Sequence, residues 1–292
     1  MNKKISYYFN QIFNNFYETS RDSDFYISLD KNLKSDIANS NFASTKSGLE
    51  DFGPFGEITM KYKEMGAINS LDLFGLDELL IFAFYWENKR NYQNVYDIGA
   101  NIGLHSILMS KCGWKVNSFE PDPETIKTFE ENISLNKALN ITINQMAVSN
   151  YNGSAEFTRV LGNTTGSHLT GAKENPYGEL DKFLVDVRDI KEIMSDADFI
   201  KLDVEGEEGK IITSTMNDSW KNCDMMLEVG SFANAEHIFQ HLNNQNVNMF
   251  SQKNNWELVS TLDEVPKSYK EGSLFVTNKK LFPMKQNHSI QP

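Results

Sequence analysis

The sequence has little cysteine and lacks long runs of apolar residues. Its 292 residues include two cysteines, Cys112 and Cys223, which both fall in or beside predicted core elements. Two thiols form no disulfide framework, so we expect them to be reduced and buried in a cytoplasmic protein. The longest apolar run, residues 79–86, is far shorter than the roughly 18 residues that cross a membrane. Because the N-terminus also lacks an apolar signal core, the sequence predicts neither a membrane span nor secretion.

Positive charge is also scarce. The chain contains 28 lysines and arginines against 40 aspartates and glutamates, which gives a formal net charge of −12 at pH 7. A protein that binds a nucleic-acid backbone needs a basic face to neutralise the phosphates. We therefore expect no nucleic-acid partner. The length suits one large domain with additional segments, and a chain of this size buries roughly three quarters of its unfolded surface, enough for a substantial core.

A strand–turn–helix pattern at 95–105, VYDIGANIGLH, is the most informative feature that the sequence does contain. A β-prone run with Asp97 near its end leads to Gly99 and Gly103, and a helical apolar pattern follows as far as Gly113. Gly99 lets the chain turn sharply and lets a ligand approach, and Gly103 lets the helix pack against the strand. Open α/β sheets bind their ligands at such a turn, at the carboxyl end of a parallel strand.

This turn differs from a dinucleotide fingerprint. The pattern G-x-G-x-x-G requires glycine at the positions that Asn101 and Leu104 hold. The Asp97 carboxylate would also repel a pyrophosphate, whereas it suits a ligand with an ammonium and a sulfonium group, as in S-adenosylmethionine. Asp-x-Gly-x-x-x-Gly is the first motif of Rossmann-like methyltransferases. The alternatives are a nicotinamide-dependent oxidoreductase, a non-catalytic S-adenosylmethionine-binding protein and a turn without any ligand.

A second short strand, residues 115–119, is followed by Glu120, Pro121 and Asp122. Glu120 lies about twenty residues beyond Gly99, the spacing that places a carboxylate beside the two hydroxyls of a ribose. Asp122 is predicted to cap the N-terminus of the next helix. The second strand therefore adds a ribose-binding acid to the first turn.

A third strand is expected at 141–148, and its last residues are Ala147 and Val148. We expect this end beside the adenine, because small apolar side chains suit the flat ring. A β-rich insert follows at about 155–188 and includes a long polar loop with His168. This insert is where we expect the acceptor to be recognised.

The stretch 198–208, DFIKLDVEGEE, places Asp203 and Glu205 after another apolar strand. Alternate side chains of an extended segment point to the same side, so we expect both acids on one side, next to the cofactor strand. The following strand ends in Glu228, which we expect, like His168, to contact the acceptor. As proton acceptors we consider these three acids and His168, and we favour the pair Asp203 and Glu205. The alternative is that Glu205 only ties the turn by accepting backbone N–H groups.

The remaining histidines do not indicate a metal site. His237 and His241 lie four residues apart on a predicted helix, which is a spacing of metal ligands. No third ligand is evident, so we expect an exposed helix face and no metal. His105, in the cofactor turn, is expected to shape the pocket rather than to act as a base.

The N-terminal part of the chain predicts a helix and then irregular structure. Residues 1–18 carry apolar side chains at helical spacing, which indicates a helix docked on its own domain or across a homodimer; a membrane-surface helix is the alternative. Residues 19–55 are polar and predict an irregular arm. A strand or hairpin is expected at 57–65, and a buried helix is expected at 77–88.

The C-terminal part is expected to complete the sheet with a helix near 233–242 and strands near 257–260 and 273–277. The predicted fold is α/β, with a Rossmann-like, seven-stranded methyltransferase sheet that is mostly parallel and has an antiparallel closing hairpin. We divide the chain into an N-terminal helix and arm at 1–56, a methyltransferase domain at 57–282 that contains the insert, and a tail at 283–292.

Together these motifs resemble the FkbM family of S-adenosylmethionine-dependent methyltransferases. The matching stretches follow the family's order over about residues 90–230, namely VYDIGANIGLH at 95–105, FEPDP at 119–123, NQMAV at 144–148 and IKLDVEGE at 200–207. The resemblance implies O-methylation, commonly of a sugar or natural-product hydroxyl, with S-adenosylmethionine as cofactor. It also implies site roles: the methionine part is held by Asp97, Gly99, Ala100, Asn101, Gly103 and His105, the ribose by Glu120 beside Pro121, the adenine by Ala147 and Val148, and the sulfonium side by Asp203.

Overall fold

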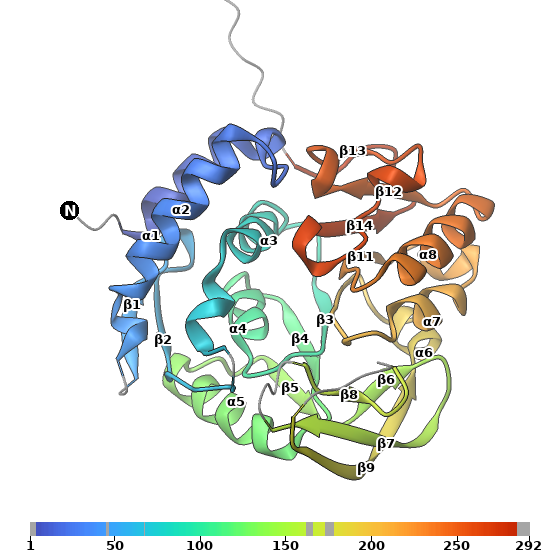
Figure 1. The fold of residues 1–292 in the computed structure, drawn as a ribbon, viewed down its shortest axis with the longest axis horizontal. Coiled ribbons are helices and arrows are strands. Elements are labelled where there is room, and N and C mark those ends of the chain that lie inside the picture. Colours follow the sequence, from blue (N-terminus) through green and yellow to red (C-terminus); the bar gives the residue numbers. More distant parts are fainter. Residues whose placement is uncertain (1–3, 45–46, 67, 162–165, 173–177, 285–292) are drawn as a thin grey trace, which may run out of the picture.

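One large sheet forms the centre of the computed structural model, which describes residues 4–44, 47–66, 68–161, 166–172 and 178–284 (Figure 1). Among these residues the sheet has eight strands in the order β13-β12-β14-β11-β10-β3-β4-β5. Its parallel strands are β3 (Asn94–Ile98), β4 (Lys115–Phe119), β5 (Ile141–Asn144), β10 (Phe199–Leu202) and β11 (Asp224–Glu228). Their carboxyl ends lie along one edge, so the predicted Rossmann-like α/β fold is confirmed.

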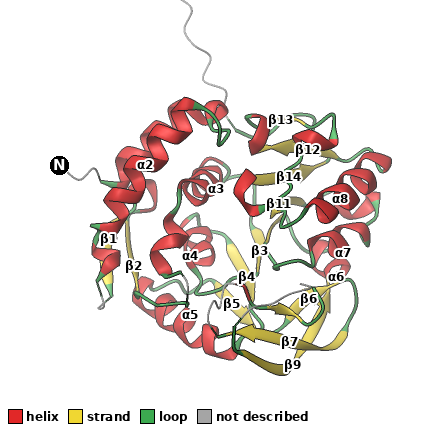
Figure 2. Ribbon diagram, viewed as in Figure 1, coloured by secondary structure: helices red, strands yellow, loops and turns green. Residues whose placement is uncertain are grey.

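Helices cover both faces of this sheet (Figure 2). They are α3 (Leu76–Glu87), α4 (Leu104–Lys111), α5 (Pro123–Asn136), α6 (Ile190–Met194), α7 (Glu208–Thr213) and α8 (Phe232–Asn244). Val95 of β3 belongs to the buried cluster under α3 and α4, whereas Ile98 of the same strand belongs to the cluster under α6, α7 and α8. Strand side chains alternate between the faces, and this alternation separates the two clusters.

The β-rich insert forms a second, smaller sheet. It consists of β6 (Ala147–Ser149), β9 (Leu180–Asp189), β7 (Gly153–Val160) and β8 (His168–Leu169), in that order. The expectation of one strand at 141–148 was wrong, because β5 belongs to the large sheet and β6 to the small one. The chain turns between them, where the Met146 N–H donates to the Asn144 carbonyl at 2.9 Å.

The N-terminal segment contains more regular structure than its composition predicts. The helix α1 (Ile5–Asn15) forms as expected, but α2 (Asp24–Ala38) occupies the middle of the segment that we expected to be irregular. Its apolar positions follow helical spacing and are buried, while polar residues fill the positions between them. The Ser23 side chain caps this helix by accepting from the Tyr26 N–H at 3.0 Å. The strand β2 (Glu57–Met60) falls in the stretch expected to form a strand or hairpin, but its partner β1 (Gly48–Asp51) lies in the segment expected to be irregular.

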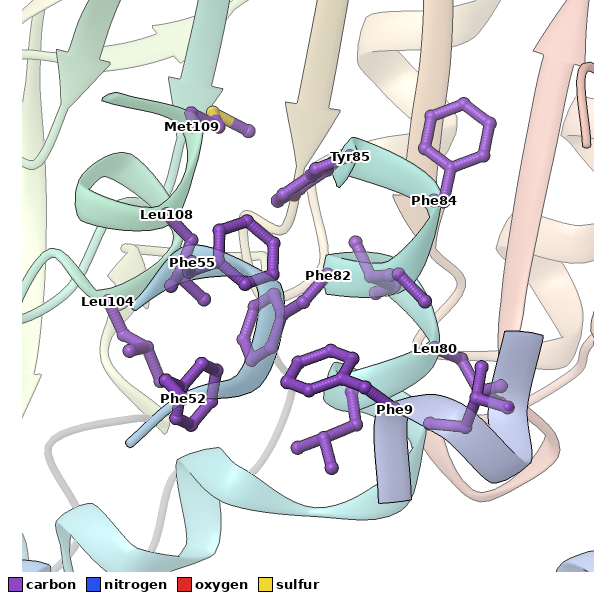
Figure 3. Packing of buried hydrophobic residues seen from close by; sticks show 14 of the residues in the cluster. Phe9, Phe52, Phe55, Leu80, Phe82, Phe84, Tyr85, Leu104, Leu108 and Met109 are labelled. Atoms are coloured by element: carbon purple, nitrogen blue, oxygen red, sulfur yellow. The ribbon is translucent and has the colours of Figure 1, made fainter. Parts of the chain in front are cut away.

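Aromatic side chains hold the N-terminal segment against the domain (Figure 3). Phe9 of α1 meets Phe52 edge to face with ring centroids 5.4 Å apart, and it also contacts Phe55 at 5.7 Å. Phe52 in turn contacts Phe82 of α3 at 5.9 Å. These rings join α1 to the cluster that covers one face of the sheet, as expected for a helix docked on its own domain.

The closing edge of the sheet differs in detail from its expected form. The antiparallel strand β14 (Ser273–Thr277) lies between β11 and β12 (Asn248–Ser251), and the short β13 (Glu257–Leu258) pairs with β12 on the outside. The strand expected at 257–260 is reduced to these two residues of β13. The strand β12 was not expected, since its four residues are too few to show an alternating pattern.

The contacts of Phe9 predict its contribution to stability. Phe9→Ala should lower the free energy of unfolding by about 3–5 kcal/mol, because it removes a fully buried ring from the aromatic cluster. Urea denaturation followed by tryptophan fluorescence measures this loss. Ile27→Ala on α2, where the side chain is 54% exposed, is the control and should change stability by less than about 1 kcal/mol. Equal losses in the two variants would contradict the docking of α1.

Candidate active site

Two glycines form the turn after β3, and other parts of the protein occupy the space where their side chains would lie. A Cβ at Gly99 (φ 79°) would lie 1.7 Å from the Asp203 carbonyl oxygen, and a Cβ at Gly103 (φ 86°) would lie 2.0 Å from the Phe129 ring. The positive φ of Gly99 agrees with the expected sharp turn, but the close neighbours differ from those expected. Gly99 makes room for the backbone that follows β10, and Gly103 makes room for α5 rather than for the strand.

Glu120 is linked directly to this turn. Its Oε2 accepts from the Asn101 N–H and its Oε1 from the Asp122 N–H, both at 2.9 Å. Burial raises the pKa of Glu120 to about 7, with smaller raising effects from Asp122 and Asp97, while the two backbone donors lower it. Each oxygen accepts one backbone bond and retains a lone pair. Glu120 can thus accept two hydroxyl groups.

Asp97 is fully buried, and only one of its two carboxylate oxygens accepts a hydrogen bond from the described residues. Its Oδ2 accepts from the Ser106 hydroxyl at 2.5 Å, and Ser106 also lies 2.8 Å from the Ser118 hydroxyl. Its Oδ1 has no hydrogen-bond partner among the residues that the structure describes. Burying a carboxylate oxygen without a hydrogen-bond donor costs free energy. A cationic group of a ligand would supply both a donor and the opposite charge.

His105 is held by both of its ring nitrogens. Nε2 lies 2.8 Å from Glu78 Oε2, and Nδ1 lies 2.8 Å from the Tyr85 hydroxyl. Burial raises the pKa of Glu78, but His105 and Lys201 lower it more, so the net direction is downward. Both ring nitrogens are therefore engaged by protein groups, and the role of His105 toward a ligand stays a prediction. Sequence reasoning missed Glu78, whose helical position gave no sign of this contact.

The acids after β10 lie on a turn and not on an extended segment. Glu205 has φ 55° and Gly206 has φ 118°, so the expectation that alternation would align Asp203 with Glu205 was wrong in its reason. Glu208, which sequence reasoning missed, ties this turn because its Oε1 accepts from the Gly206 N–H at 2.9 Å. Burial raises the pKa of Glu208.

A buried lysine stands among the acids of the site. Lys201 is 8% exposed, and its Nζ lies 3.2 Å from Asp203 Oδ2. Burial lowers its pKa, but Asp203, Asp97 and Glu78 raise it more, so the net direction is upward. Sequence reasoning overlooked Lys201. The signal was present, since a lysine inside a strand that is buried on both sides needs a charged partner.

The three predicted acids follow two adjacent parallel strands. Leu202 of β10 pairs with Leu227 of β11, so Asp203 and Glu228 are the next residues along the two strands. Burial raises the pKa of Glu228 well above its ordinary value, and Asp203, Glu78 and Glu205 raise it further, while Lys201 lowers it. The carboxyl ends of β10 and β11 therefore carry these acids, whose roles stay predictions.

The other predicted site residues lie in or beside the second sheet. His168 is buried in β8, and its Nδ1 lies 2.8 Å from the Gly166 carbonyl oxygen. Ala147 packs in the apolar cluster of the small sheet, and Val148 packs in the core of the large one. Of the residues beside the turn, Ala100 is buried and Pro121 is half-buried. The roles of these residues toward a ligand stay predictions.

Arg159 of β7 connects the insert to the Glu120 side of the site. Its guanidinium donates to Asp122 Oδ2 at 2.7 Å and to Oδ1 at 2.6 Å, and a third bond reaches Asp181 Oδ2 at 2.8 Å. Asp122 also caps α5, as expected, by accepting from the Glu124 N–H. A bidentate pair of this kind fixes orientation, so it holds the small sheet beside the turn.

The described residues contain neither a metal-binding cluster nor a membrane-spanning helix. Within those ranges, no three His, Cys, Asp or Glu side chains are grouped as they would be to hold a metal ion. His241 Nε2 lies 3.0 Å from the Thr215 carbonyl oxygen. None of the helices in the described part of the chain has the length and apolar character to span a membrane.

Comparisons with known proteins place the chain in one family. The model of the methyltransferase FkbM domain matches residues 97–249, just over half of the chain. The comparison with curated proteins found no match.

Solved structures with similar folds include three methyltransferases. The precorrin-6y C5,15-methyltransferase of Geobacter metallireducens GS-15 is 13% identical with a TM-score of 0.36, over 67% of this chain and 84% of that chain. A SAM-dependent methyltransferase of Agrobacterium tumefaciens is 9% identical with a TM-score of 0.42, over 79% and 69%. The ribosomal protein L11 methylase of Lactobacillus delbrueckii subsp. bulgaricus is 14% identical with a TM-score of 0.37, over 68% and 75%. TM-scores this low carry no argument, so the assignment rests on the family model.

The contact between the two turns predicts the effect of a small substitution. Gly99→Ala should lower the free energy of unfolding by at least about 3 kcal/mol, because it combines a positive φ with a clash against the Asp203 carbonyl. Gly113→Ala is the matched control, since Gly113 has φ 88° but no atom within 4 Å of an added Cβ. It should lose about 1–2 kcal/mol. If urea denaturation gave similar losses of unfolding free energy for Gly99→Ala and Gly113→Ala, the contact between Gly99 and the Asp203 carbonyl would be unimportant for stability.

Proposed function

The chain belongs to the FkbM family of S-adenosylmethionine-dependent methyltransferases, and we propose that it methylates a hydroxyl oxygen of a sugar, glycan or natural-product acceptor. The observation that carries the hydroxyl assignment is the cluster of acids at the carboxyl ends of β10 and β11, beside the turn after β3. An alcohol is a poor nucleophile, so its methylation benefits from a nearby group that accepts the hydroxyl proton.

The residues of the site fit the cofactor. The orphaned Asp97 Oδ1 suits the ammonium of the methionine part, and the free lone pairs of Glu120 suit the two ribose hydroxyls. The other cofactor residues in this proposal are Gly99, Ala100, Asn101, Gly103, His105, Pro121, Ala147, Val148 and Asp203.

S-adenosylmethionine supplies an electrophilic methyl group: the acceptor oxygen forms the new O–C bond, and the electron pair of the broken C–S bond stays on sulfur. The chain's own residues must orient the hydroxyl in line with that bond and take its proton. Asp203, Glu205 and Glu228 are the acids available on this side. His168 is a weaker choice as base or acceptor contact, because it is buried and its Nδ1 is engaged by Gly166.

The family match favours methyl transfer over nicotinamide-dependent oxidation. The acid cluster also favours catalysis over simple binding of S-adenosylmethionine, because binding alone does not require three further acids beside the turn. The test is transfer of a tritium-labelled methyl group from S-adenosylmethionine to a panel of methyl glycosides, compared with amines of similar size. Label in the glycosides supports the proposal, and label confined to the amines contradicts it.

Isothermal titration tests the cofactor site. S-adenosylhomocysteine should bind and NADH should not. The Asp97→Asn substitution should weaken the binding of S-adenosylhomocysteine at least about tenfold, because it removes the charge that faces the ammonium group. Asp218→Asn is the control, because the Asp218 side chain is 83% exposed. This variant should bind S-adenosylhomocysteine as tightly as the wild type does. Unchanged affinity in Asp97→Asn would show that the ligand binds elsewhere.

The raised pKa of Glu120 predicts a pH dependence of binding. The ionised carboxylate accepts both ribose hydroxyls, so the affinity for S-adenosylhomocysteine should rise as the pH increases through about 7, where Glu120 loses its proton. Glu120→Gln should bind more weakly and lose this rise. Titrations from about pH 6 to about pH 8 check both points. If the affinity of the wild type fell as the pH rose over this range, Glu120 would not bind the ribose as a carboxylate.

A further inference from the structure

Most acids of the site already have a protein partner. Asp97 accepts from Ser106, Glu120 accepts from two backbone N–H groups, Glu78 pairs with His105, and Asp203 pairs with Lys201. Within the described ranges, the carboxylate of Glu228 has neither a hydrogen bond nor an ion pair, although neighbouring charges act on it. A half-buried acid without a donor is open to a donor from outside the protein.

We propose that Glu228 is the catalytic base, which accepts the proton of the acceptor hydroxyl, and that Lys201 is a positioning residue that holds Asp203. This inference rests on the proposed O-methylation. It names the group that performs the proton transfer, and it separates Glu228 from Asp203, which the sequence pattern favoured.

Strand register supports this division of roles. Lys201 is paired with Asp97 on one side and with Met226 on the other. Paired residues of parallel strands project to the same face, and Glu228 lies two residues beyond Met226. Lys201, Asp97 and Glu228 therefore share the face that α3 covers with Glu78. Glu228, at the end of β11, is separated from β3 by one strand, β10.

The ion pair engages Asp203. Lys201 Nζ lies 3.2 Å from Asp203 Oδ2, so this carboxylate already has a donor within the protein. Glu228 has no such contact among the described residues, and most of the charges that act on it are negative. The charged groups that act on it are Glu78 of α3, Lys201 of β10, and Asp203 and Glu205 of the following turn.

The direction of the Glu228 pKa agrees with its position. Burial and three like charges raise it well above its ordinary value, and Lys201 lowers it. In its ionised form, a carboxyl group with a raised pKa is a stronger base than an ordinary carboxylate. In the reaction the O–H bond breaks, the proton goes to the Glu228 carboxylate, and the electron pair stays on the oxygen that forms the new O–C bond.

The first test compares Glu228→Gln with Glu257→Gln, an exposed control on β13. Isothermal titration with S-adenosylhomocysteine should give wild-type affinity for both variants, because neither residue holds the cofactor. Transfer of labelled methyl groups to methyl glycosides should fall about 10²- to 10⁴-fold in Glu228→Gln and stay unchanged in Glu257→Gln. Undiminished transfer in Glu228→Gln would overturn the role of Glu228, while absence of transfer to any hydroxyl by the wild type, with transfer to amines, would overturn the proposed function instead.

The second test uses the charges around Glu228. In Asp203→Asn a like charge is removed, so the pKa of Glu228 should fall and the acidic limb of the pH–kcat profile should move to lower pH. If the acidic limb stayed in place or moved to higher pH, the charge of Asp203 would not raise the pKa of Glu228 as proposed.

A third measurement needs no acceptor. Carbon-13 NMR of glutamate carboxyl groups, with the Glu228 signal identified by its absence in Glu228→Gln, should show a midpoint well above about 4.3 in the wild type and a lower midpoint in Asp203→Asn. An ordinary midpoint in the wild type would overturn the proposal even if no tested glycoside is methylated.

Discussion

The arrangement of the site depends on one buried cation. Lys201 lies inside the sheet with little exposure, and it is surrounded by Asp97, Asp203 and Glu78. Removing a charge from water is costly unless opposite charges surround it, so the strand order that places β10 between β3 and β11 also determines where the acids can lie. The carboxylate oxygens without a protein donor are open to a donor from a ligand. Asp97 Oδ1 and Glu228 are the ones that lack a protein donor within the described residues.

A second constraint aligns the two halves of the site. The missing side chain of Gly99 lets the Asp203 carbonyl pack against the turn after β3, so this turn and the turn after β10 are in direct contact. Glu120 extends this contact through Asn101, and Arg159 joins it to the insert through Asp122. The turns after β3 and β10 and the small sheet are thus linked by one connected set of backbone and side-chain contacts.

Local patterns allowed much of the fold to be predicted. The strand β3, its turn, α4 and the capped start of α5 follow from residues that are neighbours in the sequence. The helix α2 was missed because polar residues separate its buried positions, and the strand at 141–148 was expected to be continuous because nothing in its composition marks the turn at Met146.

Long-range contacts of the site were less accessible to sequence reasoning. Glu78, Lys201 and Arg159 act through partners that are distant in the chain, such as His105, Asp97 and Asp122. The acids were found because each follows an apolar strand, and the carboxyl ends of parallel strands share an edge. Their different roles were not accessible, because they depend on which acid Lys201 pairs with.

A crystal structure with bound S-adenosylhomocysteine would test the central claim most directly, because that claim concerns which acids face the ligands. The account predicts that the ligand's ammonium donates to Asp97 Oδ1, that both ribose hydroxyls donate to Glu120, and that the Glu228 carboxylate faces the sulfur without a protein donor. A ligand bound away from the turn after β3, or a Glu228 side chain turned into a hydrogen bond with the protein, would contradict it.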